Sequence, residues 1–305
     1  MARTEVLGPA GRQPGRSETG AALTLASRLP RLVLEARRVA ASLAHGIHGR
    51  RRAGPGETFW QFRPFVAGES AGRIDWRRSG RDERLYVRER EWESPHSVWL
   101  WFDRSASMAF RSDLAGAPKG ERAFVIGLAL ADALVDGGER VGLLGLAAPS
   151  ASRAVAERLA ETLCAHERDL DEDLAPPLAL ARQDEAILIG DFLAPPEEIA
   201  RRIAAIAARG ARGHLLLVVD PVEESFPFEG QAVLHDLEAG LRLRIGDAAS
   251  WGAVYRARMA AHREALRAAA ARHGWTLTLH HTDRPASEPA LRLLTLLAGA
   301  RRGEA

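Results

Sequence analysis

The sequence predicts an α/β fold with a doubly wound, mostly parallel sheet, and three observations support this prediction. Short apolar runs alternate with longer amphipathic stretches from residue 98 onward, which is typical of βαβ units with right-handed crossovers. The run from Val98 to Phe102 is apolar at all five positions, which indicates a strand covered on both faces. Three of the runs end in an aspartate, namely Asp103, Asp191 and Asp220. Because parallel strands end along a common edge, this pattern places carboxylates where such sheets bind ligands.

The individual elements follow from periodicity and from helix terminators. Strands are expected at 98–102, 141–146, 186–189, 215–219 and 276–279. Helices are expected at 122–135, 151–165, 195–208, 251–273 and 289–298, and Gly210 and Gly274 follow two of them as typical terminators. One segment, 225–246, breaks the alternation. It contains Pro227, Gly230 and an alternating run from Leu241 to Ile245, which predicts a β-hairpin excursion.

The N-terminal third of the sequence lacks the strand–helix alternation of the rest. Residues 1–22 are rich in Gly, Pro, Arg and Ser without periodicity, so we expect a disordered leader there. An imperfect helical stripe begins near Leu23, and short strands follow up to residue 95. We therefore expect three parts: the leader at 1–22, an N-terminal segment at 23–95 that packs on or beside the core, and the α/β domain at 96–300.

Composition narrows the class of protein. The 305 residues are 46% hydrophobic and 27% charged, as in ordinary soluble globular proteins. The net charge is only +2, and carboxylates offset the arginines that lie among aromatic residues in 59–93, so nucleic acid is not an expected partner. The only lysine is Lys119, and we attribute this preference for arginine to codon usage in a GC-rich genome. The single cysteine excludes an intramolecular disulfide.

Membrane and export signals are also missing from the pattern. The longest apolar stretch, 123–135, is interrupted by Asp132 and falls short of the roughly 18 residues that a membrane-spanning helix requires. The N-terminal residues lack the charged and then apolar arrangement of a signal peptide. We therefore expect no integral membrane segment and a cytoplasmic location.

The candidate site begins at the end of the first strand. Asp103, Ser105 and Ser107 follow it at a spacing of two residues, and Asp191 follows the strand at 186–189. Their oxygens suit Mg²⁺, which prefers oxygen ligands and retains several waters. The alternative is that Asp103 or Ser107 only caps the following helix. Convergence of carboxylates from two strands favours the metal site.

Several motifs in the chain resemble a known family. The motifs are Gly56-Glu-Thr-Phe59 with Arg63, Gly68-Glu69, Arg73-Ile-Asp75-Trp76-Arg-Arg-Ser79-Gly-Arg81, Val87 to Glu91, and the Asp103 strand. In this order they resemble the signature of the domain of unknown function 58 family, and Asp220-Pro-Val-Glu223 and Phe226 to Gly230 resemble its C-terminal half. The resemblance extends from about residue 27 to the end. It implies a von Willebrand factor A-like domain and an association with MoxR-type AAA+ ATPases.

The resemblance also implies a metal-ion-dependent adhesion site. Asp103, Ser105 and Ser107 match its first motif, and Asp191 matches its third. The middle motif departs from the family pattern, because Asp171-Glu172-Asp173-Leu174 has an acidic residue where a threonine is expected. Glu172 is therefore a further candidate ligand. In such a site, Mg²⁺ would offer an open coordination position to a carboxylate of a partner protein.

These observations predict a non-enzymatic protein-interaction module. It would serve as an adaptor or co-chaperone of a MoxR-type AAA+ ATPase, and other von Willebrand factor A proteins are possible partners. A first alternative is a metal-free structural scaffold with a degenerate adhesion site. A second is a metal-dependent phosphohydrolase with Asp103 as nucleophile, but Ser105 stands where a second aspartate would be required.

Overall fold

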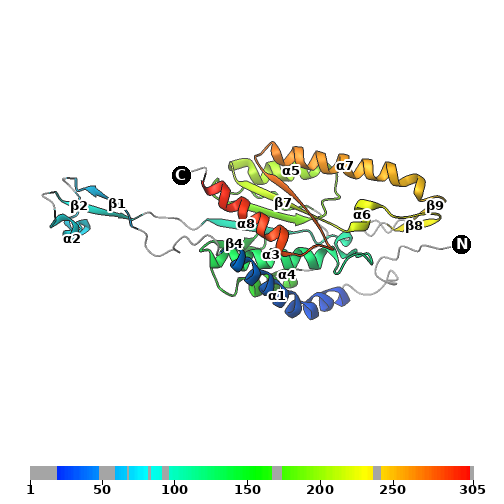
Figure 1. Ribbon diagram of the computed structural model, residues 1–305, viewed down its shortest axis with the longest axis horizontal. Coiled ribbons are helices and arrows are strands. Elements are labelled where there is room, and N and C mark those ends of the chain that lie inside the picture. The colour runs from blue at the N-terminus through cyan, green and yellow to red at the C-terminus, as the bar shows by residue number, and fades with distance from the viewer. Residues whose placement is uncertain are drawn as a thin grey trace. The chain divides into compact units, whose positions relative to one another are not determined.

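A computed structural model describes residues 19–47, 59–66, 69–81, 84–90, 96–166, 174–235 and 242–302. The chain divides into two compact units. The larger unit combines residues 1–49 with 96–305, and the smaller unit comprises residues 50–95. Figure 1 shows the elements of both. The predicted leader falls mostly on residues 1–18, which lie outside the described residues.

The smaller unit contains the short strands that the sequence predicts. β1 (Phe59–Pro64) and β2 (Tyr86–Arg90) pair in antiparallel orientation, and the short helix α2 (Trp76–Ser79) precedes β2. Asp75 caps α2 by accepting a hydrogen bond from the backbone N–H of Arg78 at 2.9 Å. Ser79 Oγ accepts one from the backbone N–H of Tyr86, also at 2.9 Å. Two residues of the family motif therefore stabilise this unit locally.

A six-stranded sheet forms the centre of the larger unit, in the order β10-β7-β6-β3-β4-β5. Its strands are β3 (Ser97–Phe102), β4 (Arg140–Leu143), β5 (Ala147–Ser150), β6 (Glu185–Gly190), β7 (Arg212–Val219) and β10 (Thr276–His281). All neighbours are parallel except β4 and β5. This confirms the mostly parallel α/β class. The single strand expected at 141–146 is wrong, because the chain turns back after β4 with Gly145 at a φ of +80° and continues as β5.

Helices cover both faces of this sheet (Figure 1). One face carries α1 (Thr19–Ile47), α3 (Lys119–Asp136), α4 (Val155–Ala165) and α8 (Ser287–Arg302), and the other carries α5 (Pro196–Ile206) and α7 (Ala249–Ala271). Alternate residues of β3 serve the two faces, since Leu100 belongs to the first core and Trp101 to the second. The predicted hairpin excursion is present as β8 (Ala232–His235) and β9 (Arg242–Ile245).

The first helix corrects the expected domain boundary. We expected the segment 23–95 to form one part, but α1 begins at Thr19 and belongs to the larger unit. Its residues Leu32, Ala36 and Leu43 are buried in the core cluster that also contains residues of α3, α4 and α8. The apolar stripe of α1 is removed from water there, so the helix is held by the α/β core rather than by the small strands.

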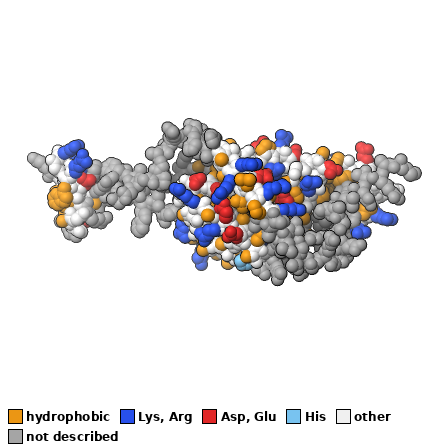
Figure 2. Space-filling model, turned by 90° about the horizontal axis from the view of Figure 1, so that it is seen from below, with side chains coloured by type: hydrophobic (Ala, Val, Ile, Leu, Met, Phe, Trp, Pro, Cys, Tyr) orange, Lys and Arg blue, Asp and Glu red, His pale blue; other side chains and the backbone are white. Residues whose placement is uncertain are grey.

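The surface provides two findings that bear on partners. No helix among the described residues is both long enough and apolar enough to cross a membrane. Figure 2 shows Lys and Arg side chains interspersed with Asp and Glu over the described part of one face. Such mixing differs from the continuous basic track with which proteins follow a phosphate backbone.

The strand order changes direction at β3. The chain passes through α3 to β4 on one side of β3, and it returns through α4 to β6 on the other side. In doubly wound sheets, ligands bind beyond the carboxyl ends of the strands at this reversal. The loops that follow β3 and β6 are therefore the expected location of a site, and they carry Asp103 and Asp191.

Candidate functional site

Four of the five predicted site residues come together at the carboxyl ends of β3 and β6. Asp103, Ser105, Ser107 and Asp191 are all buried. Ser107 Oγ donates a hydrogen bond to Asp191 Oδ2 at 2.7 Å, which joins residues 84 positions apart. The hydroxyls of Ser105 and Ser107 lie 2.9 Å apart, and Asp103 Oδ1 accepts the backbone N–H of Ser105 at 2.9 Å. The fifth residue, Glu172, lies outside the described residues.

Backbone features on β6 allow this close approach. A Cβ atom on Gly190 would lie 2.5 Å from the Cβ of Asp103, so no larger residue fits beside that carboxylate without a shift. Phe192, directly after Asp191, has a φ of 50°, a conformation that costs a non-glycine residue roughly 1 kcal/mol or more. The ring of Phe192 is buried beside Trp101, and its carbonyl accepts a hydrogen bond from His262 Nε2 at 2.7 Å. These contacts hold the turn that orients Asp191.

A lysine occupies the centre of the site. Lys119 is completely buried, and its Nζ donates to Asp191 Oδ2 at 2.8 Å and to Glu223 Oε1 at 2.6 Å. Asp191 Oδ2 thus accepts hydrogen bonds from both Ser107 and Lys119. The ammonium also lies 5.9 Å from the centre of the Phe110 ring. A continuous chain of hydrogen bonds therefore links the serines, Asp191, Lys119 and Glu223.

The third predicted strand end completes the network. Asp220 follows β7 and caps the short helix α6 (Pro221–Ser225) in a capping box with Glu223. Glu223 Oε2 accepts the backbone N–H of Asp220 at 2.9 Å, while Oε1 receives Lys119. Asp220 also accepts the backbone N–H of Ser112 at 2.8 Å and its hydroxyl at 2.5 Å. The loop between β3 and α3 is thereby attached to the ends of both β6 and β7.

The electrostatics of Lys119 are set by two opposing effects. Burial opposes the charged form, but the carboxylates of Asp191 and Glu223 more than offset burial, so the pKa of Lys119 is raised. Lys119 therefore stays protonated at neutral pH, between two carboxylates. Burying a charge is costly unless it is paired and hydrogen-bonded, and here it is both.

This arrangement does not suit the predicted Mg²⁺. The serine hydroxyls are bonded to each other and to Asp191, and Asp191 is already paired with an ammonium group. At an effective dielectric constant of 20, two unit charges 4 Å apart repel by about 4 kcal/mol, and Mg²⁺ carries two charges. A separate finding concerns other sets of residues: no group of three or more His, Cys, Asp or Glu among the described residues could hold a metal ion.

Sequence reasoning missed Lys119 and Glu223. Codon usage does not explain Lys119, and a sole lysine just beyond an Asp-x-Ser-x-Ser loop is a usable signal. The helix was expected to begin at Arg122, three residues too late, because Pro118 at its N-cap provides no side-chain cap. Glu223 was noted only as part of a family motif.

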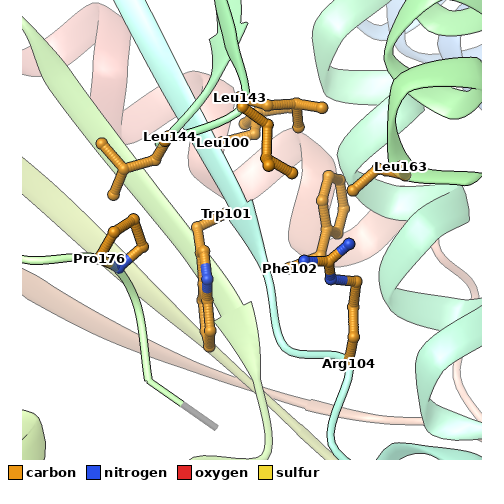
Figure 3. A pocket seen from close by; sticks show the side chains of 10 residues that line it. Leu100, Trp101, Phe102, Arg104, Leu143, Leu144, Leu163 and Pro176 are labelled. Atoms are coloured by element: carbon orange, nitrogen blue, oxygen red, sulfur yellow. The ribbon is translucent and has the colours of Figure 1, made fainter. Parts of the chain in front are cut away.

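A separate pocket of about 220 Å³ lies beside this network. Arg104 is its one charged lining residue, and Figure 3 shows Arg104 next to Phe102. The other lining residues are Leu100, Trp101, Leu143, Leu144, Gly145, Leu146, Leu163 and Pro176. None of the predicted site residues contributes to the lining. Arg104 Nη1 donates to the carbonyl of His166 at 3.2 Å, which fixes it against the end of α4.

Comparison with protein families identifies the chain. A family model described as "Protein of unknown function DUF58" matches residues 61–265. This chain belongs to the DUF58 family. The match begins in β1 and ends in α7, so it includes both the small strand unit and the network around Lys119. Our prediction of the family is confirmed.

This DUF58 protein is similar to two mycobacterial proteins that are named as uncharacterized. One from Mycobacterium bovis and one from Mycobacterium tuberculosis are each 29% identical over 235 residues, which cover 71% of this chain and 72% of theirs. Among solved structures, the conserved hypothetical protein BatB from Bacteroides thetaiotaomicron has a TM-score of 0.38 and 15% identity, covering 67% of this chain and 99% of its own. An aerotolerance-related membrane protein from Bacteroides fragilis has a TM-score of 0.36 and 14% identity, covering 66% and 97%.

Proposed function

We propose that this DUF58 protein is a non-enzymatic protein-interaction module of von Willebrand factor A type, which acts in the cytosol as an adaptor or co-chaperone of a MoxR-type AAA+ ATPase. The observation that supports this most is the bond from Ser107 to Asp191. It joins two residues that match the first and third motifs in the sequence resemblance, at the carboxyl edge of a parallel sheet. In an adhesion-type site, these residues would face a partner protein at this edge.

Exposed apolar side chains on the same edge support the proposal. Leu114 lies on the loop between β3 and α3 and is 59% exposed, and Leu193 lies just after Asp191 and is 43% exposed. Single exposed leucines are common on protein surfaces. These two, however, stand on the loops that the buried network holds in place, so they are suitable contacts for a partner at this edge.

The internal completeness of the network favours one alternative. Its hydroxyls, carboxylates and ammonium are bonded to one another, as expected of a metal-free scaffold with a degenerate adhesion site. A scaffold of this kind would hold the loops without binding a partner there. Measuring partner binding distinguishes the interaction module from the scaffold.

The test is direct binding to a purified MoxR-type AAA+ ATPase from the same genome, measured by isothermal titration calorimetry with ATP or ADP. We expect binding, and we expect Leu114→Ser and Leu193→Ser each to weaken it about tenfold through lost apolar contact. Leu34→Ser is a matched control, because Leu34 is 52% exposed on α1. Its affinity should equal that of the wild type.

Two results would contradict the proposal. Absence of binding in either nucleotide state, with correctly folded protein, would favour the scaffold. Equal losses in all three leucine variants would mean that the interaction does not use the carboxyl edge.

A further inference from the structure

We propose that the ammonium group of Lys119 is the resident cation of this site and takes the place of the divalent metal ion of an adhesion-type site. The site would then be complete without metal. This inference concerns the protein by itself, so it does not depend on the identity of any partner.

Position is the first argument. Lys119 Nζ lies within hydrogen-bonding distance of Asp191, which is the third-motif ligand, and Asp191 in turn accepts Ser107 of the first motif. A metal ion at this point would also lie between the loop after β3 and the carboxylate after β6. Glu223 supplies a second negative partner from α6. The ammonium therefore joins the same loops that a shared metal ion would join.

The choice of residue is the second argument. Of the 42 Lys and Arg residues in the chain, Lys119 is the only lysine. An ammonium is a compact point charge with three donors, whereas a guanidinium is a larger planar fork. A site shaped for a single ion accommodates the former. In a chain that otherwise uses arginine, lysine occurs at the one position where a compact cation is needed.

The location of Lys119 is the third argument. It is the first residue of α3, at the positive end of the helix dipole, where a cation is unfavourable. It is also fully buried, which occurs for a lysine only when it is paired, as Lys119 is with Asp191 and Glu223. Local preferences therefore oppose a lysine at this position, and such violations are typical of functional sites.

The experiment compares wild type, Lys119→Ala and Lys119→Met by thermal unfolding in EDTA, MgCl₂ and MnCl₂, with Mn²⁺ binding followed by electron paramagnetic resonance. The wild type should bind no Mn²⁺ at the site and show the same Tm in all three solutions. Lys119→Ala opens a space beside Asp191 and Glu223, so Mn²⁺ should bind and raise its Tm by ~5–10 °C at a hundredfold excess over Kd. Lys119→Met fills that space without charge and should not respond to metal.

The outcomes decide the proposal as follows. The proposal is supported if metal raises the Tm of Lys119→Ala and leaves the Tm of the wild type unchanged. Saturable Mn²⁺ binding to the wild type that is lost in Ser107→Ala overturns it, because the serines would then hold a metal beside the lysine. A Lys119→Ala variant that folds and ignores metal also overturns it. If Lys119→Ala does not fold in EDTA, refolding it with Mn²⁺ provides the same comparison, and the wild-type result stands independently.

Discussion

Two buried polar regions lie on the same sheet and differ in their charge and in their hydrogen bonding. At the carboxyl ends of β3 and β6, Lys119 and Asp191 are charged and bonded to each other, and each has a second partner, Glu223 and Ser107 respectively. On β10, under α8, Thr278 Oγ1 and His280 Nε2 are buried with no hydrogen-bond partner within the described part of the chain. The first region buries charged groups that are hydrogen-bonded to one another, and the second buries neutral atoms without a hydrogen-bond partner among the described residues.

The difference follows from the cost of burial. An unpaired charge in the interior is so costly that the group neutralises instead, whereas an unpartnered neutral group costs only about 1–3 kcal/mol. The histidines behave accordingly. Burial, with a smaller effect of the charge on Arg122, lowers the pKa of His280 to about 3, and burial lowers that of His214 to about 4. Both are therefore neutral in the folded protein at pH 7, whereas Lys119 keeps its charge.

The largest expected effect comes from removing one partner of the buried ion pair. Asp191→Ala leaves Lys119 with only Glu223 and removes the acceptor of Ser107. We expect a loss of ~3–5 kcal/mol in the free energy of unfolding, which is typical when a buried charge loses its partner. The measurement is urea unfolding at pH 7.5, followed by circular dichroism.

Two controls sharpen this comparison. Asp113→Ala changes an exposed carboxylate on the same loop and should alter stability by less than about 0.5 kcal/mol. The triple variant Lys119→Met, Asp191→Leu and Glu223→Gln removes all three charges of the group, so it should be more stable than Asp191→Ala alone. If Asp191→Ala lowered the free energy of unfolding by less than about 1 kcal/mol, the buried charge on Lys119 would not require this partner.

The second prediction concerns the neutral region and pH. His280 has a lower pKa folded than unfolded, so the unfolded chain takes up more protons as pH falls below about 6.5, and stability falls with it. Between pH 7 and pH 5 this single group should cost ~2 kcal/mol, since one pKa unit corresponds to ~1.4 kcal/mol. His280→Leu should therefore flatten the acid side of the stability profile, measured by urea unfolding at pH 5, 6 and 7.

Other groups must be separated from this effect. The pKa of Asp132 is raised to about 6 by burial and by Glu157, so its contribution has the opposite sign, with stability lost as pH rises from about 4 to 6. Asp132 and His214 are present in wild type and in His280→Leu, so their contributions cancel in the comparison. His273→Leu, at an exposed position, is the control and should keep the wild-type slope. An unchanged slope in His280→Leu would contradict the assignment.

The two regions also differ in how far the sequence could predict them. Strand periodicity and the rule that parallel strands share an edge were enough to bring Asp103 and Asp191 together. The role of Lys119 could not be derived in the same way, because its partners lie 72 and 104 residues away and its own helix start carries no capping signal. Likewise, the reversal at Gly145 lies inside an apolar run that predicts a longer strand. Local sequence patterns predict individual helices and strands. Ion pairs between distant loops form only in the assembled fold, so such patterns do not predict them.

The smallest expected effect lies at the rim of the charged region. Ser112→Ala removes the hydroxyl bond to Asp220 and the bond that Ser112 Oγ accepts from the exposed backbone N–H of Leu114. Asp220 keeps the backbone N–H groups of residue 112 and of Val222, and the N–H of Leu114 is accessible to water. Because no acceptor is left without a donor, the loss should be about 1 kcal/mol by urea unfolding. Ser225→Ala, whose exposed hydroxyl bonds only within α6, should be within about 0.5 kcal/mol of the wild type. If Ser112→Ala lowered the free energy of unfolding as much as Asp191→Ala, the remaining hydrogen bonds to Asp220 would not compensate for the lost hydroxyl. The prediction would then be wrong.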